Sequence, residues 1–201
     1  MKRRLGTGHV FEMTGSELSY LSEMPRRNSI KKSSAPDMIN SFWDIIEDEV
    51  EDWSKYHIAT LKGEQLYGIN MKEFWSTRDK IYYFFLLKDN KPVLFASFIY
   101  EIEARAWIED EVAKYKSKNS IVDLYKAILS SKKISFVPKR IGGKDHSKGM
   151  EKVWRNQLSK VFKTSVIKRE NGHYFPTKLS IKDKEVWSDD LKNPYYVVIE
   201  K

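Results

Sequence analysis

The side chains best placed to do chemistry in this sequence are basic, and they gather around a glycine-rich loop in the C-terminal half. Gly142, Gly143 and Lys144 precede a stretch with helical spacing, where backbone amides and nearby cations would suit an anion. Neither the Walker A motif G-x-x-x-x-G-K-[ST] nor the dinucleotide motif G-x-G-x-x-G occurs. The loop therefore predicts a contact with a DNA phosphate or a coenzyme pyrophosphate, or else it is an ordinary solvated loop.

The distribution of charge favours a nucleic acid as the anion. The 201 residues carry a net charge of +8, but residues 114–201 hold twenty-one bases and nine acids, a net charge of +12. Such a field attracts polyanions, because each neutralised phosphate releases condensed counterions. A solvated lysine-rich surface is the alternative. The expected nucleic-acid contacts are the bases of this region: Lys139, Arg140, Lys144, Lys148, Lys152, Arg155, Lys163, Lys168 and Arg169.

Residue types that catalyse reactions or bind metals are absent or scattered. The sequence has no cysteine, which excludes disulfides, thiolate chemistry and cysteine-based zinc sites. The four histidines have no metal-ligand spacing, and none accompanies a serine-nucleophile signature: His9, His57, His146 and His173. We therefore expect no catalytic residue, no metal and no cofactor.

The clearest element is a helix at residues 37–53. Ser34 is a candidate N-cap, Asp37 suits the first turn, and apolar residues then recur every three to four positions. The opposite face is acidic. We expect it to be solvated, or to bind a basic partner protein or the protein's own basic half, through Asp44, Glu47, Asp48 and Glu51.

The most apolar segment, residues 71–112, must supply core, but its secondary structure is ambiguous. The runs IYYFFLL (81–87) and VLFASFIY (93–100) flank Lys88–Pro92, which is a hairpin pattern. FASFIYEIEARAWIEDEVAKY (95–115) fits a helix equally well, since continuous apolar runs do not separate a buried strand from a buried helix.

Further elements are expected in the C-terminal half. Ser120 can cap one helix, and Ser147 can cap a second helix whose apolar residues run from Met150 to Phe162. Asn171-Gly172 predicts a hairpin turn, and PYYVVIEK closes the chain as a strand.

Four short segments occur in the order and near the spacing of a known family. They are Lys55-Tyr56, STRDKIYYFFLL, FASFIYEIEARAWIEDEV and LYKAILSSKKISF. Together they resemble the N-terminal part of the T-even phage helicase loader family, over residues 53–136. Glu109 stands where that family usually has Gly, and Ser97 stands where Asn is frequent. Residues 140–201 match no part of the family's C-terminal domain.

The resemblance implies a fold and a function. It implies a helical Met71–Val112 region in a small duplex-binding domain of high-mobility-group-like shape. The matching residues Arg78, Lys80, Trp107 and Asp110 are then scaffold. It implies a phage replication accessory protein that binds forked or single-stranded DNA and contacts the replicative helicase or a single-strand-binding protein.

On this basis we expect a mainly α fold, with α+β as the alternative. The expected domains are a flexible basic arm at 1–36, a helical domain at 37–136 and a basic region at 137–201. The last region would hold one long helix and a β-hairpin.

Two other functions stay open. The hairpin at 81–100 followed by KKISFVP, KRIGGKDHSKG, a helix and a last strand resembles the core of GNAT-type acetyl-CoA-dependent acyltransferases. The loop reads Ile-Gly-Gly-Lys after Lys139-Arg140, which departs from that family's R/Q-x-x-G-x-G/A. The second is an inhibitor or adaptor that binds protein through the acidic helix.

The sequence also bears on location. No apolar run is long enough to span a bilayer, and the N-terminal segment lacks the apolar core of a signal peptide. We expect a cytoplasmic protein without membrane contact, in the host cytoplasm if it is phage-encoded.

Overall fold

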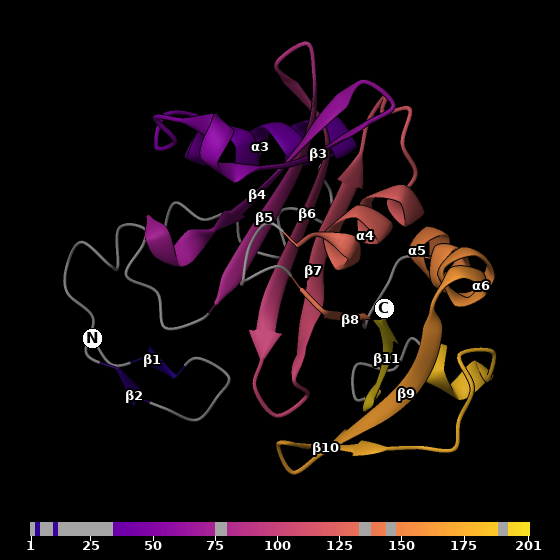
Figure 1. Ribbon diagram of the computed structural model, residues 1–201. Coiled ribbons are helices and arrows are strands. Elements are labelled where there is room, and N and C mark those ends of the chain that lie inside the picture. The colour runs from indigo at the N-terminus through magenta and orange to yellow at the C-terminus, as the bar shows by residue number, and fades with distance from the viewer. Residues whose placement is uncertain are drawn as a thin grey trace.

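A large mixed β-sheet dominates the protein. The computed structural model describes residues 3–4, 10–11, 34–74, 80–132, 138–143, 148–188 and 193–201. One nine-stranded sheet has the order β10-β9-β11-β8-β7-β6-β5-β4-β3 (Figure 1). Its strands are β3 (His57–Leu61), β4 (Glu64–Asn70), β5 (Ile81–Lys88), β6 (Lys91–Glu101), β7 (Ala106–Lys114), β8 (Arg140–Gly143), β9 (Lys163–Glu170), β10 (His173–Pro176) and β11 (Tyr195–Glu200). The expected mainly α fold is wrong, and an α+β description fits.

The remaining elements are short strands and helices. β1 (Arg3–Arg4) and β2 (Val10–Phe11) form a separate two-stranded sheet. The helices are α3 (Ala35–Glu47), α4 (Ile121–Ser130), α5 (Lys148–Val153) and α6 (Ser159–Val161), with a π-helical turn η3 (Trp154–Leu158) between the last two. Short 3-10 turns lie at η1 (Trp53–Tyr56), η2 (Met71–Glu73) and η4 (Lys184–Trp187).

The segment Met71–Val112, expected to be helical from the family resemblance, consists mostly of strands. β5 and β6 pair around Asp89 and Asn90, whose φ angles of 52° and 59° are the positive values that a type I′ hairpin turn requires. Residues of β5 alternate between two cores, with Tyr82, Phe84 and Leu86 in one and Tyr83, Phe85 and Leu87 in the other. Because both faces are covered, the strand has no polar alternation that could have distinguished it from a helix.

Helix α3 covers one face of β5 and β6. Its start is as predicted, because Ser34 and Asp37 form a capping box. Ile39, Phe42, Trp43 and Ile46 pack against the sheet. The helix ends at Glu47 rather than Trp53. Its last turn carries no basic residue, and the negative end of the helix dipole disfavours the acids that follow.

The second half of the sheet has a different connectivity. β7 and β8 run parallel and are joined through α4, whose predicted cap Ser120 forms a capping box with Asp123. The last strand, β11, lies between β8 and β9 and is antiparallel to both. The hairpin β9–β10 turns at Asn171 and Gly172 as predicted.

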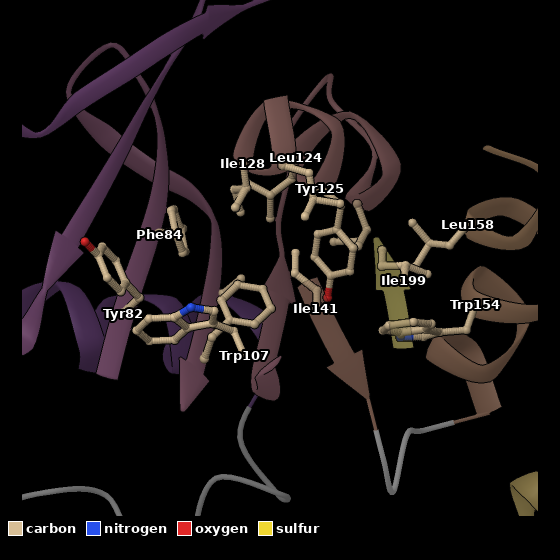
Figure 2. Packing of buried hydrophobic residues seen from close by; sticks show 14 of the residues in the cluster. Tyr82, Phe84, Trp107, Leu124, Tyr125, Ile128, Ile141, Trp154, Leu158 and Ile199 are labelled. Atoms are coloured by element: carbon tan, nitrogen blue, oxygen red, sulfur yellow. The ribbon is translucent and has the colours of Figure 1, made fainter. Parts of the chain in front are cut away.

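The largest core lies on the face opposite α3. Figure 1 shows α4 and α5 side by side on this face, and Figure 2 shows how side chains of α4 and η3 meet those of the sheet. Tyr125 of α4 contacts Trp154 of η3 with ring centroids 6.1 Å apart. Ile141 of β8 and Trp107 of β7 belong to the same cluster. Hydrophobic side chains therefore link the two halves of the sheet.

The expected long helix is present at residues 148–161, with a π-helical turn in its middle. Trp154 and Leu158 are fully buried, as predicted, but Val161 is 43% exposed. A π turn holds an extra residue and changes the phase of the helix. The inward position after Leu158 therefore passes from Val161 to Phe162, which packs against the core.

The expected domain boundaries are largely outside the described residues. Most of the arm at 1–36 and the segment 133–137 belong to the parts that are not described. The nine-stranded sheet takes strands from both 37–136 and 137–201.

Candidate nucleic-acid interface

A basic groove lies along the helix at residues 148–161. Its volume is about 540 Å³, and it is lined by Lys148, Glu151, Lys152, Arg155, Asn156 and Lys182. Four of these six residues are cationic and one is a carboxylate. Three of the cations, Lys148, Lys152 and Arg155, belong to the set predicted from the sequence to contact nucleic acid.

The helix presents these residues because its other side is held in the core. Trp154 and Leu158 are fully buried, while Lys148, Lys152 and Asn156 are exposed. Helical spacing places positions 148, 152 and 155 on one side. The π turn contributes Arg155 and Asn156 to the groove, and such turns often occur at functional sites.

Arg155 is engaged on both of its terminal nitrogens. Nη1 donates to Glu151 Oε1 at 2.7 Å, one turn earlier on the helix. Nη2 donates to the backbone carbonyl of Lys182 at 2.9 Å. The guanidinium thus joins the helix to the opposite wall of the groove.

The opposite wall is a compact turn around Lys182. Ile181 is buried in the core, and its carbonyl accepts a hydrogen bond from Trp187 Nε1 at 2.6 Å. The Ser180 backbone N–H donates to Asp183 Oδ2 at 2.7 Å. Lys182 itself is exposed. Sequence reasoning missed it, because no local pattern places a turn 27 residues beyond Arg155 against the same helix.

Most of the other predicted contact residues lie elsewhere and have partners. Arg140 and Lys163 both pair with Glu200, at 3.6 Å each, and Lys168 pairs with Glu170 at 3.4 Å. The Arg169 guanidinium lies 5.7 Å from the centre of the Tyr174 ring. Lys139 is exposed just before β8, and Lys144 lies outside the described residues. Of the nine residues predicted to contact nucleic acid, the structure therefore places Lys148, Lys152 and Arg155 together in the groove.

Among the residues that the structure describes, no acid forms an ion pair with Lys148, Lys152 or Lys182, although the groove also contains Glu151. Within the groove, these three ammonium groups have no acidic partner among the described residues. Because Arg155 already has two partners, the cationic character of the groove depends mainly on lysines from two separate segments.

The four acidic residues expected to bind a partner protein are all exposed. Asp44 and Glu47 lie on α3, Asp48 is its C-cap, and Glu51 follows the helix. Of the scaffold residues from the family resemblance, Trp107 is buried in the core and Lys80 Nζ lies 5.2 Å from the centre of the Tyr100 ring. Arg78 lies outside the described residues.

Two buried carboxylates lie away from the groove. Glu109 accepts a hydrogen bond from the Tyr125 hydroxyl, and the pKa of Tyr125 is raised well above its usual value by burial and then by Glu109. Glu64 accepts hydrogen bonds from the segment before α4. In the described part of the chain, no three His, Cys, Asp or Glu residues form a group that could hold a metal ion.

No family model, curated protein or solved structure matches this chain. Within the ranges that the structure describes, no helix is long and apolar enough to cross a membrane.

Proposed function

We propose that this protein binds nucleic acid through the basic groove at residues 148–156 and 182. The observation that supports the proposal most directly is the meeting of Lys148, Lys152 and Lys182 around one hollow without ion-pair partners among the described residues. Phosphates neutralised by lysine release counterions, which drives binding at low salt.

The lining of the groove favours contact with the phosphate backbone over contact with bases. No aromatic residue is among its six lining residues, so it offers no platform for stacking. Lysine is a point charge without the planar fork with which arginine reads a base or grips a phosphate. The proposal is therefore binding with little sequence preference, strengthened by the charge of +12 over residues 114–201.

The finer proposal, a replication accessory protein for forked or single-stranded DNA that contacts the helicase or a single-strand-binding protein, rests on the four sequence segments alone. The helical fold that came with that resemblance is wrong. Binding of nucleic acid in the groove does not require that resemblance.

The test compares binding of forked, duplex and single-stranded DNA to the wild-type protein and to Lys148→Ala/Lys152→Ala. Wild-type affinity should fall with salt, and the double substitution should lower the slope of log affinity against log salt by about 1.8 on duplex DNA. Lys160→Ala and Lys184→Ala are matched controls, since both lysines are exposed nearby but do not line the groove. If the controls weaken binding as much as the groove variant, the groove is not the site.

One observation favours a second function, a GNAT-type acetyl-CoA-dependent acyltransferase. β7 and β8 are parallel and joined through α4, and helix α5 follows β8 in the chain. A strand followed by a helix is consistent with that enzyme core, although Gly142 and Gly143, predicted to lie in its coenzyme loop, are part of strand β8. In open sheets with such crossovers, ligands bind beyond the carboxyl ends of the parallel strands. Calorimetry with acetyl-CoA separates the two functions, because heat from acetyl-CoA without DNA binding would favour the transferase.

A further inference from the structure

Arg155 is held by two protein oxygens at the place where the sequence predicts a phosphate contact. A guanidinium grips phosphate through two parallel N–H donors. Here Nη1 is held by Glu151 at 2.7 Å and Nη2 by the Lys182 carbonyl at 2.9 Å. Each terminal nitrogen therefore already donates one N–H to a protein oxygen, and the Glu151 carboxylate beside the guanidinium would repel a phosphate.

The place of Lys182 depends on this contact. Its turn is fixed to the core through Ile181 and closed by Ser180 and Asp183. Only the bond from Arg155 to the Lys182 carbonyl ties the tip of the turn to the helix, among the hydrogen bonds seen between described residues. That bond holds the Lys182 backbone against the helix, and Lys182 lines the groove together with Lys148 and Lys152.

We propose that Lys182 is the third phosphate contact of the groove and that Arg155 is a positioning residue that holds it there. This inference rests on the proposed nucleic-acid binding, and it changes the role that the sequence gives to Arg155. Lysines from two chain segments then bind the phosphate backbone, while the arginine between them builds the site.

The experiment measures binding of a single-stranded oligothymidylate over a range of salt for Lys182→Ala, Arg155→Ala, Arg155→Lys and the double variant Arg155→Ala/Lys182→Ala. Lys182→Ala should reduce the salt slope by about 0.7, which is one phosphate contact on a single strand. Arg155→Ala should reduce it by a similar amount. The double variant should reduce the salt slope by no more than either single variant does, because Arg155 acts through Lys182.

Arg155→Lys separates positioning from direct contact. Lysine keeps the charge but lacks the planar two-nitrogen fork that donates to Glu151 and to the Lys182 carbonyl, so we expect it to behave like alanine. A lysine variant that retains the wild-type slope, or a double variant whose losses add, would show that residue 155 touches phosphate itself and would overturn the inference. Circular dichroism confirms that each variant is folded.

A second measurement needs no DNA. Without the Arg155 bond, the backbone amides of Lys182 and Asp183 should exchange hydrogen faster in Arg155→Ala and in Arg155→Lys than in the wild type. Unchanged exchange would refute the positioning role even where binding is lost. If the wild-type protein does not bind the oligonucleotide, the proposed function fails and the phosphate role of Lys182 fails with it. Faster exchange would then support the positioning role alone.

Discussion

At the scale of single residues, Glu64 joins two parts of the fold outside the hydrophobic cores. Its side chain is buried, and it accepts hydrogen bonds from Ser117 Oγ at 2.5 Å, the Lys118 backbone N–H at 2.8 Å and Asn119 Nδ2 at 2.8 Å. One carboxylate therefore fastens the segment between β7 and α4 to the β3–β4 hairpin. A buried charge is tolerated here because its lone pairs are satisfied by donors.

Substitution of Glu64 should show this directly. Glu64→Ala removes the acceptor of three hydrogen bonds and should lower the free energy of unfolding by about 3 kcal/mol, while Glu64→Gln should lower it by about 1 kcal/mol. Chemical denaturation measures both. Glu47→Gln is the control, since Glu47 is exposed. Equal stability of Glu64→Ala and the control would show that the network does not hold the loop.

The same residue predicts a pH dependence. Burial raises the pKa of Glu64, but the hydrogen bonds from Ser117, Lys118 and Asn119 outweigh it, so the pKa lies below its ordinary value of 4.5. A carboxyl whose pKa is lower in the folded state stabilises the protein fully above the unfolded pKa, and this contribution is lost as pH falls. Wild-type stability should therefore fall below pH 4.5 more steeply than that of Glu64→Gln, as followed by denaturation at successive pH values. Parallel curves would contradict the lowered pKa.

At the scale of elements, the helices could be predicted from the sequence and most strands could not. Ser34 and Ser120 are caps with an acid three residues later, and both helices begin where those residues predict. β5 and β6 are buried on both faces, so only the turn at Asp89 and Asn90 indicated strands. The family resemblance predicted a helix there. The segment instead forms strands whose two faces are both covered by other parts of the fold.

Some residues of the candidate site could likewise be predicted from the sequence and others could not. Lys148 and Lys152 follow from helical spacing, which is local information. Lys182 reaches the groove only through the tertiary contact of its turn with Arg155. The π turn shifts the helix phase and leaves Val161 exposed, and no local sequence pattern predicted this turn.

The cap of α4 gives the element-scale prediction. Ser120 Oγ accepts from the Asp123 backbone N–H at 3.1 Å. Ser120→Ala should lower the free energy of unfolding by about 1 kcal/mol, the usual cost of losing an N-cap. Ser130→Ala, at the exposed end of the same helix, should change it by less than about 0.5 kcal/mol. Urea denaturation of both variants makes the comparison, and an equal effect would mean that the cap does not determine where α4 begins.

At the scale of the whole molecule, the sheet has a narrow seam. β7 and β8 pair only at Trp107–Ile141 and Ile108–Gly142. A Cβ atom on Gly142 would lie 2.6 Å from Ile108 Cδ1, so a larger residue there would require the Ile108 side chain to move. Few backbone hydrogen bonds therefore join the meander β3–β7 to the strands β8–β11. The core under α4 and α5 spans the seam instead.

This balance predicts how the protein unfolds. If side-chain packing rather than backbone pairing joins the halves, they should open together, and the slowest amides of β5 and β6 should report the same opening free energy as those of β9 and β11. Trp154, fully buried beside Tyr125, should then affect both sides. Trp154→Ala should lower both opening free energies by about 3–5 kcal/mol, the usual cost of emptying a large aromatic site.

Native-state hydrogen exchange measures the two groups of amides in one sample. Ile102→Ala is the matched control, because Ile102 is 74% exposed at the β6–β7 turn and its loss should leave both groups unchanged. If Trp154→Ala lowers the opening free energy only for amides of β9 and β11, the two halves unfold separately, with the seam as their boundary. The common core would then be too weak to couple them. The groove lysines, all on the C-terminal side of the seam, would sit on a unit that can open while the meander stays folded.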